Sequence, residues 1–162
     1  MANLYFTANG VPPTTAAQVA VTTGTVIKSL LQIATPSTTE IRVVEWGISF
    51  DGSVAATPIK VELLQTDVAA TVTSVTPTLF NEPSSSASLC VGGASATGHT
   101  ATAEGTITAT RVFDVQFIAP TNQYIKQYPL GREPQIPVSK FLRVRVTAAA
   151  AVNAYCYVIW EE

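Results

Sequence analysis

The clearest pattern along the chain is the alternation of apolar and polar residues that half-buried strands show. In residues 40–50, EIRVVEWGISF, one side carries Val44, Trp46, Ile48 and Phe50. Because successive side chains of a strand point to opposite faces, this period of two predicts a strand with one face in the core. The Asp51-Gly52 pair that follows is a strong turn signal.

The same alternation recurs in four later segments. Their apolar sides are Ile59, Val61 and Leu63; Phe113, Val115 and Phe117; Leu142, Val144 and Val146; and Val152, Ala154, Cys156, Val158 and Trp160. In the last segment the opposite side carries Tyr155, Tyr157 and Ile159, so neither face is plainly polar. We expect that second face to contact another element or another subunit.

One segment, VIKSLLQIA at residues 26–34, is also compatible with helical spacing. Its threonine-rich approach and the flanking Gly24 and Pro36 favour a strand. Residues 2–7, 105–110 and 123–128 are further strand candidates.

About eight short strands separated by turns, with no long helix, predict an all-β fold. The best single expectation is one domain over residues 1–162, an antiparallel β-sandwich of jelly-roll type. Residues 81–104 are rich in Ser, Ala, Gly and Thr and show neither period, so we expect a long loop there.

Composition narrows the range of partners. Hydrophobic residues make up 47% of the chain and charged residues only 12%, and the formal net charge is -2. A surface with so few charges suggests packing against other chains. We expect no nucleic-acid partner, because no cluster of Lys and Arg is present, and no membrane partner, because no apolar stretch is long enough to span a bilayer.

The segment SLCVGGASATGHTATAEG, residues 88–105, holds the side chains that most resemble a catalytic set. Cys90, His99 and Glu104 could be written as nucleophile, base and orienting group. However, His99 is the only histidine, and nothing in the small residues between it and Cys90 fixes their geometry. The spacing also matches no zinc, calcium or phosphate-binding motif. We therefore expect no catalytic residues, metal or cofactor, and the state of Cys90 stays open.

Two segments carry candidate interface residues. Residues 122–137 contain Tyr124, Tyr128 and Arg132 among prolines that stiffen an extended arm. An ordinary connection between strands accounts for this segment equally well. Tyr155 and Tyr157, on the unexpectedly apolar side of the last strand, form the second candidate.

Residues 14–53 and 129–162 together resemble the capsid decoration, or cement, proteins of tailed bacteriophages, which are small β-sandwich or jelly-roll proteins. The resemblance implies a non-enzymatic structural protein, made in the host cytoplasm and bound to the capsid exterior of the virion. It further implies that the major capsid protein is its partner, that it forms a homo-oligomer, with a trimer favoured, and that it stabilises contacts between capsomers.

Two other functions remain open from the sequence. The first is a receptor- or carbohydrate-binding β-sandwich of a phage tail or surface appendage. Trp46 and Trp160 both fall on predicted core faces, which argues against stacking on sugars. The second is an enzyme built on residues 88–105. The order of the oligomer, the surface that contacts the partner, the choice between capsid and tail, and the ordering of residues 81–104 on assembly are likewise open.

Overall fold

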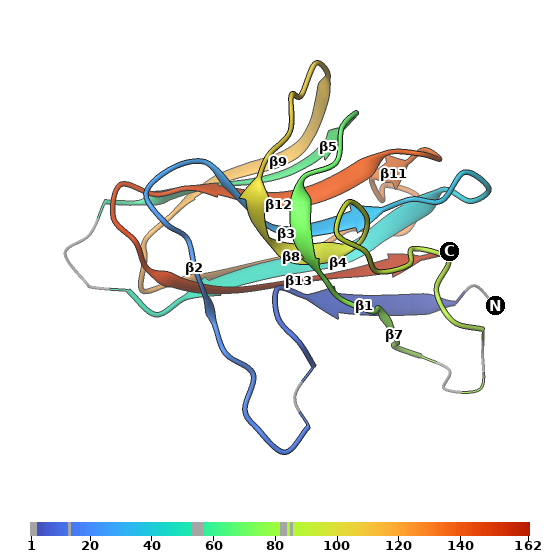
Figure 1. Ribbon diagram of the computed structural model, residues 1–162, viewed down its shortest axis with the longest axis horizontal. Helices are drawn as coiled ribbons and strands as arrows, with labels where there is room; N and C mark the ends of the chain where they lie inside the picture. Colours follow the sequence, from blue (N-terminus) through green and yellow to red (C-terminus); the bar gives the residue numbers. More distant parts are fainter. Residues whose placement is uncertain (1–2, 13, 53–56, 82–83, 85) are drawn as a thin grey trace.

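The computed structural model describes residues 3–12, 14–52, 57–81, 84 and 86–162 (Figure 1). These residues form strands, turns and loops, and the described part contains no helix, so none that could cross a membrane. The strands are β1 (Leu4–Ala8), β2 (Val21–Thr22), β3 (Lys28–Ala34), β4 (Ile41–Phe50), β5 (Ile59–Thr66), β6 (Thr71–Ser74), β7 (Thr78–Leu79), β8 (Gly98–Ala103), β9 (Thr110–Ile118), β10 (Gln123–Gln127), β11 (Gln135–Ile136), β12 (Phe141–Thr147) and β13 (Asn153–Glu161).

The strands form two antiparallel sheets that pack face to face. Sheet 1 has the order β10-β4-β13-β1-β7, with β11 beside β4 and β2 beside β13; sheet 2 has the order β6-β8-β3-β12-β5-β9. The four-stranded units β10-β4-β13-β1 and β3-β12-β5-β9 have the strand order of a jelly roll. The predicted all-β sandwich is confirmed. The expected count of about eight strands is wrong, because β2, β6, β7, β8 and β11 add to this framework.

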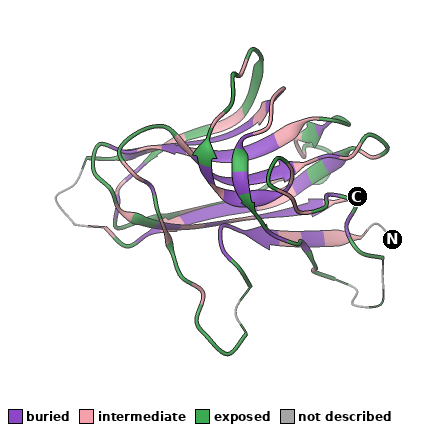
Figure 2. Ribbon diagram, viewed as in Figure 1, coloured by how far each residue is buried: buried purple, intermediate pink, exposed green. Residues whose placement is uncertain are grey.

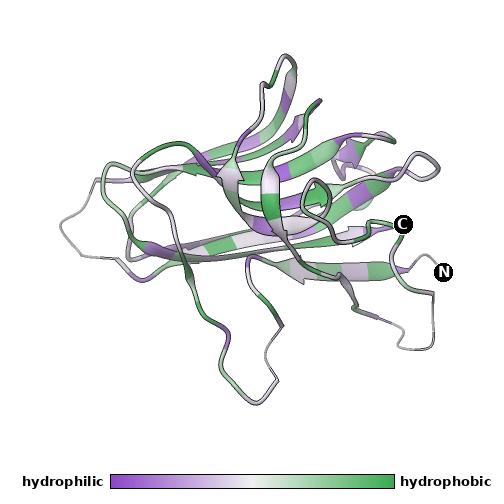
Figure 3. Cartoon of the chain, in the orientation of Figure 1, coloured by the Kyte–Doolittle hydropathy of each residue, from purple (hydrophilic) through white to green (hydrophobic). Residues whose placement is uncertain are grey.

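The core lies between the sheets and is built from the inward sides of their strands (Figure 2). Trp46 from β4 and Trp160 from β13 are fully buried there. The alternation that predicted these strands is visible as bands of opposite hydropathy along sheet 2 (Figure 3). Residues 28–34 form strand β3, so the helical alternative for that segment is wrong. The threonines before this segment and the flanking Gly24 and Pro36 indicated the correct structure.

The predicted core face of β4 is wrong at one position. Val43 is fully buried, whereas Val44 is only half-buried. Along β13 the pairing passes from Ile159 opposite Glu45 to Trp160 opposite Val43. Val44 is therefore the extra residue of a β-bulge, and the bulge reverses the alternation on that side of it.

The predicted core face of β9 is wrong for Val115 and Phe117, whereas Phe113 packs against the core as expected. Gln116 lies opposite Val61, and Asp114 lies opposite Leu63, and these two β5 residues are fully buried. Directly paired residues point to the same face, so Asp114 and Gln116 point inward while Val115 and Phe117 point outward. Asp114 is satisfied there, because its carboxylate accepts hydrogen bonds from the Tyr124 hydroxyl at 2.9 Å and the Gln116 amide at 2.8 Å.

Residues 81–104 are not a continuous loop, and residues 105–110 are not a strand. Strand β8 pairs with β3 and with β6, and residues 105–109 form the connection that leads to β9. Gly98 of β8 approaches β6 so closely that a Cβ on it would lie 2.4 Å from the Thr73 carbonyl oxygen. Strand β8 shows no apolar alternation in the sequence, because its residues are small and its pairing is made by backbone groups.

Candidate interaction surface

Cys90, His99 and Glu104 have separate surroundings in the structure. None of the hydrogen bonds of these three described side chains joins one of them to another. Cys90 is a free thiol in the main core, and burial together with the nearby Glu162 carboxylate raises its pKa. The His99 ring pairs with the Thr100 hydroxyl at 2.8 Å, and burial lowers the pKa of the imidazole. A thiol that keeps its proton in this way is a poor nucleophile.

Glu104, directly after β8, joins the end of that strand to β3 and β12. Its carboxylate accepts hydrogen bonds from the Ser29 amide at 2.5 Å and from the Ser29 hydroxyl at 2.6 Å. It also forms an ion pair with the Arg143 guanidinium at 2.9 Å. Arg143 is 0% exposed, and its guanidinium further donates to the carbonyl oxygens of Glu104 and Val68. This network joins β3 and β12 to the segments that cover them.

Gln32 makes a second polar anchor beside Arg143. The two residues are opposite each other on β3 and β12, and both are fully buried although they point away from the sandwich core. The Gln32 amide group donates to the Ala96 carbonyl at 2.7 Å and accepts from the Ala70 amide at 2.7 Å. Polar side chains therefore hold the segments that lead into β6 and β8 against the outer sides of β3 and β12, and we call these segments the covering layer. A small apolar cluster of Ala70, Val72 and Ala101 lies beside them.

Asp67, directly after β5, bonds to the residues that lead into β9. Its carboxylate accepts hydrogen bonds from the Thr108 hydroxyl and from the amides of Thr108 and Ala109, at 3.2 and 3.1 Å respectively. These hydrogen bonds, with that of the Thr108 hydroxyl the largest, lower the pKa of Asp67 from 3.8 to about 2. The residues that leave β5 and those that enter β9 are thus joined.

Because the pKa of Asp67 is lower in the folded than in the unfolded chain, its contribution to stability is complete well above pH 3.8 and is lost as the pH falls towards 2. We expect Asp67→Asn to lower the urea midpoint at neutral pH. The difference from the unmodified protein should shrink as the pH falls from about 5 to about 2, measured by circular dichroism at each pH. A difference that is the same at every pH would contradict this role of the carboxylate.

The outer face of sheet 1 carries Tyr155 and Tyr157, two of the predicted interface residues. Neighbouring strands place further apolar side chains beside them. We call this surface the aromatic face; its members are Phe6 (β1), Ile125 (β10), Tyr155 and Tyr157 (β13), while Ile159 of β13 lies buried on the same side of the sheet. The rings of Phe6 and Tyr157 stack with centroids 5.9 Å apart, and those of Tyr155 and Tyr157 lie 6.4 Å apart.

Tyr157 is held flat on the sheet by its neighbours. A Cβ on Gly47 would lie 2.6 Å from the Tyr157 ring, so the ring lies directly on the glycine backbone. The Tyr157 hydroxyl donates to the Glu45 carboxylate at 2.5 Å. Burial and this hydrogen bond raise the pKa of Tyr157. Beside it, Tyr155 and Ile125 help line a shallow depression of about 150 Å³ that also contains Gln123 and Ser49.

The other predicted interface residues lie elsewhere. Tyr124 points between the sheets, 5.4 Å from the ring of Trp46, and burial followed by its bond to Asp114 raises its pKa to about 12. Tyr128 also packs against the core, where burial raises its pKa to about 12. Arg132 is exposed and ends the tight turn that begins at Pro129. The five residues thus do not form one cluster, and their roles at an interface stay predictions.

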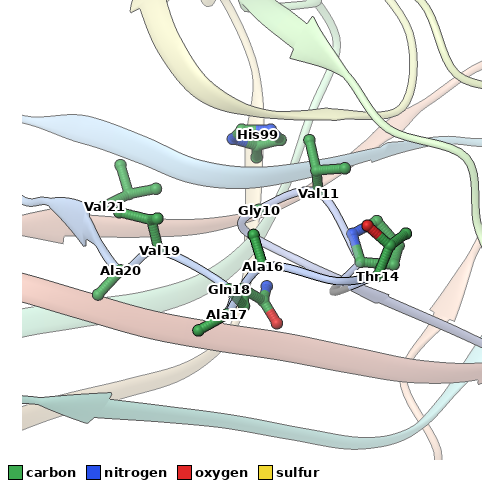
Figure 4. A pocket seen from close by; sticks show the side chains of 11 residues that line it. Gly10, Val11, Thr14, Ala16, Ala17, Gln18, Val19, Ala20, Val21 and His99 are labelled. Atoms are coloured by element: carbon green, nitrogen blue, oxygen red, sulfur yellow. The ribbon is translucent and has the colours of Figure 1, made fainter.

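A second concavity lies between the β1–β2 connection and β8 (Figure 4). It has a volume of about 360 Å³, and small apolar side chains of residues 10–21 form nearly all of its wall. His99 is the one contribution from another described segment, and its Nε2 atom has no hydrogen-bond partner there. The concavity has room for a small apolar group but offers no charged side chain. No group of three metal-binding side chains occurs among the described residues.

No protein-family model matches the chain, and no curated protein matches it. The function must therefore be inferred from the geometry of the aromatic face. Sequence reasoning found Tyr155 and Tyr157 because β13 lacks a polar side, but it missed Phe6 and Ile125. Those two residues come from strands that are distant in sequence, and only the pairing of β1 and β10 into sheet 1 brings them there.

Proposed function

We propose that this protein is a structural protein of a bacteriophage virion, a capsid decoration or cement protein that binds the outside of the head. The proposal is supported by the jelly-roll sandwich and by the resemblance of residues 14–53 and 129–162 to such proteins. The aromatic face carries it, because this face offers apolar rings on a rigid sheet and leaves them half-exposed.

The physical properties of the aromatic face suit a stable interface with another protein. Tyrosine is enriched at binding hot spots because a large ring is buried at little cost in side-chain entropy. Here that cost is already reduced, since Tyr157 is fixed by Gly47 and Glu45. A standard interface buries roughly 800 Å² on each partner, so the contact would extend from the aromatic face over its neighbours on the outer side of sheet 1.

The proposed action is mechanical. A copy seated on the major capsid protein at the joint of two capsomers buries surface on both, so separating the capsomers also exposes that surface to water. A homo-oligomer, with a trimer favoured by the resemblance, would repeat this contact around a symmetry axis of the shell.

The aromatic face can be tested directly with Tyr155→Glu. We expect this change to weaken binding to expanded heads that lack the decoration protein by at least about tenfold, because a charge would be buried in the contact. Co-sedimentation of purified protein with such heads measures the binding. Val26→Glu is the matched control, because Val26 is exposed in the loop before β3 and lies outside the aromatic face.

Failure of the unmodified protein to bind heads would overturn the proposal. The alternative of a carbohydrate-binding tail protein is weakened by the tryptophans, because Trp46 and Trp160 are fully buried and cannot stack on a sugar ring. Binding to soluble glycans in the absence of head binding would favour that alternative.

A further inference from the structure

Strand β9 forms a free edge of sheet 2. It pairs with β5 along one side, and no described strand pairs with the other. The outward backbone N–H and C=O groups of such an edge are open to another strand, and natural proteins commonly block them with proline, lysine, a bulge, an inward-pointing charge or a very short strand. At nine residues, TRVFDVQFI, β9 is long and contains neither proline nor lysine. Its bulge at Phe113 and its inward-pointing Asp114 lie before Val115, and residues 115–118 carry neither device.

The outer side of this edge is apolar. Val112 is 51% exposed, Val115 40% and Phe117 71%. The single carboxylate of the neighbouring strand β5, that of Glu62, pairs with Lys60 at 2.8 Å and with Arg145 of β12 at 3.0 Å, so the three groups together carry one positive charge. Burying the three apolar side chains would be favourable.

The order of residues in β9 favours a second copy of the same strand as the occupant. Two identical strands that pair antiparallel about a two-fold axis place one residue opposite itself. With Val115 at the axis, Gln116 lies opposite Asp114 of the second copy, an amide against a carboxylate, and the same pair occurs twice. Phe113 is the unpaired residue of the β9 bulge, so Phe117 then lies opposite Val112 of the second copy.

The two neighbouring registers of this strand pair place less favourable residues opposite each other. With Asp114 at the axis, two carboxylates lie opposite each other, which is destabilising. With Gln116 at the axis, Asp114 lies opposite the apolar Ile118 of the second copy. The Val115 register alone among these pairs the exposed apolar residues with one another and the carboxylate with a hydrogen-bond donor.

We propose that two copies of this chain join through β9, antiparallel and centred on Val115, so that sheet 2 continues from one copy into the other. The inference goes beyond the virion function and does not depend on it. The contact is two-fold, so it adds to any three-fold contact and doubles the assembly in which it occurs.

Cysteine cross-linking tests the register. Val115→Cys places two thiols across the axis, where paired Cα atoms lie about 4.5–5.5 Å apart, within disulfide range. Cys90 and Cys156 are fully buried, so they supply no competing surface thiol. We expect the Val115→Cys protein to form a covalent dimer on mild oxidation. Val26→Cys, at an exposed apolar position in the loop before β3, lies outside β9 and outside the aromatic face; it is the matched control and should not cross-link.

Sedimentation equilibrium tests the contact itself. Phe117→Lys should halve the mass of the assembly by raising its dissociation constant at least about tenfold, whereas Val26→Lys should leave the mass unchanged. Circular dichroism checks that both variants fold. An unmodified protein that is monomeric at every concentration would overturn the proposal, as would an assembly that Phe117→Lys leaves intact or that cross-links through Val26→Cys but not Val115→Cys.

Discussion

Replacing Glu104 with alanine should lower the free energy of unfolding by about 3 kcal/mol, because it leaves the Arg143 guanidinium buried without its counter-charge. Arg143 is 0% exposed, and its guanidinium donates to the carbonyl oxygens of Val68, before β6, and Glu104, after β8, so it cannot turn towards water without breaking these bonds. The same change removes the two hydrogen bonds from Ser29. Urea unfolding followed by circular dichroism measures the effect.

The double variant Glu104→Ala/Arg143→Met separates the buried charge from simple loss of packing. It should recover a large part of the lost stability, since an apolar side chain of similar length needs no partner. Glu133→Ala, at a half-buried glutamate in the connection before β11, is the control and should change stability by less than about 0.5 kcal/mol. A loss in Glu133→Ala equal to that in Glu104→Ala would contradict the role of the ion pair.

Replacing Trp46 with alanine should cost about 3–5 kcal/mol, the range for truncating a large buried aromatic side chain. Trp46 is fully buried on the inward side of β4, and its ring contacts that of Tyr124 from β10. The cavity would therefore open between the sheets and beside the edge strand. The expected result is a large fall in the thermal midpoint, measured by calorimetry.

Tyr124→Phe is the control for this prediction, because it keeps the ring and removes only the hydroxyl that donates to Asp114. Its cost should be about 1 kcal/mol. If Trp46→Ala cost no more than Tyr124→Phe, the sheets would have closed over the cavity and the expected packing role of Trp46 would be wrong.

The sequence could predict strands whose neighbours leave the alternation intact. β13 is the clearest case: Ala154, Cys156, Val158 and Trp160 are buried as expected, and the apolar second face of the strand lies on the outer side of sheet 1. Central strands of a sandwich have one face in the core along their whole length, so their pattern survives folding.

The pattern failed where tertiary structure changes which face is inward. In β4 a bulge buries Val43 in place of Val44, and such a bulge leaves no mark in composition. In β9 the inward position of Asp114 depends on the Tyr124 hydroxyl of a neighbouring strand. An edge strand can therefore invert its pattern when a distant residue supplies the hydrogen bond that a buried carboxylate needs.

The segment around Cys90, His99 and Glu104 shows what residue types alone leave open. The three residues are close in sequence, and we expected them not to form a catalytic set. In the structure each has a different set of contacts. The contribution of Glu104 to the covering layer could not be foreseen, because its partners, Ser29 and Arg143, lie 75 and 39 residues away.

The pairing of β1 with β13 decides how the fold would respond to a pulling force. Leu4 lies opposite Glu161 and Ala8 opposite Tyr157, and both chain ends leave the molecule at the same end (Figure 1). Tension applied at residues 4 and 161 would peel this ladder open one hydrogen bond after another, since the bonds run perpendicular to the strands. A protein that braces a shell would therefore resist best when the load enters across its sheets rather than through its ends.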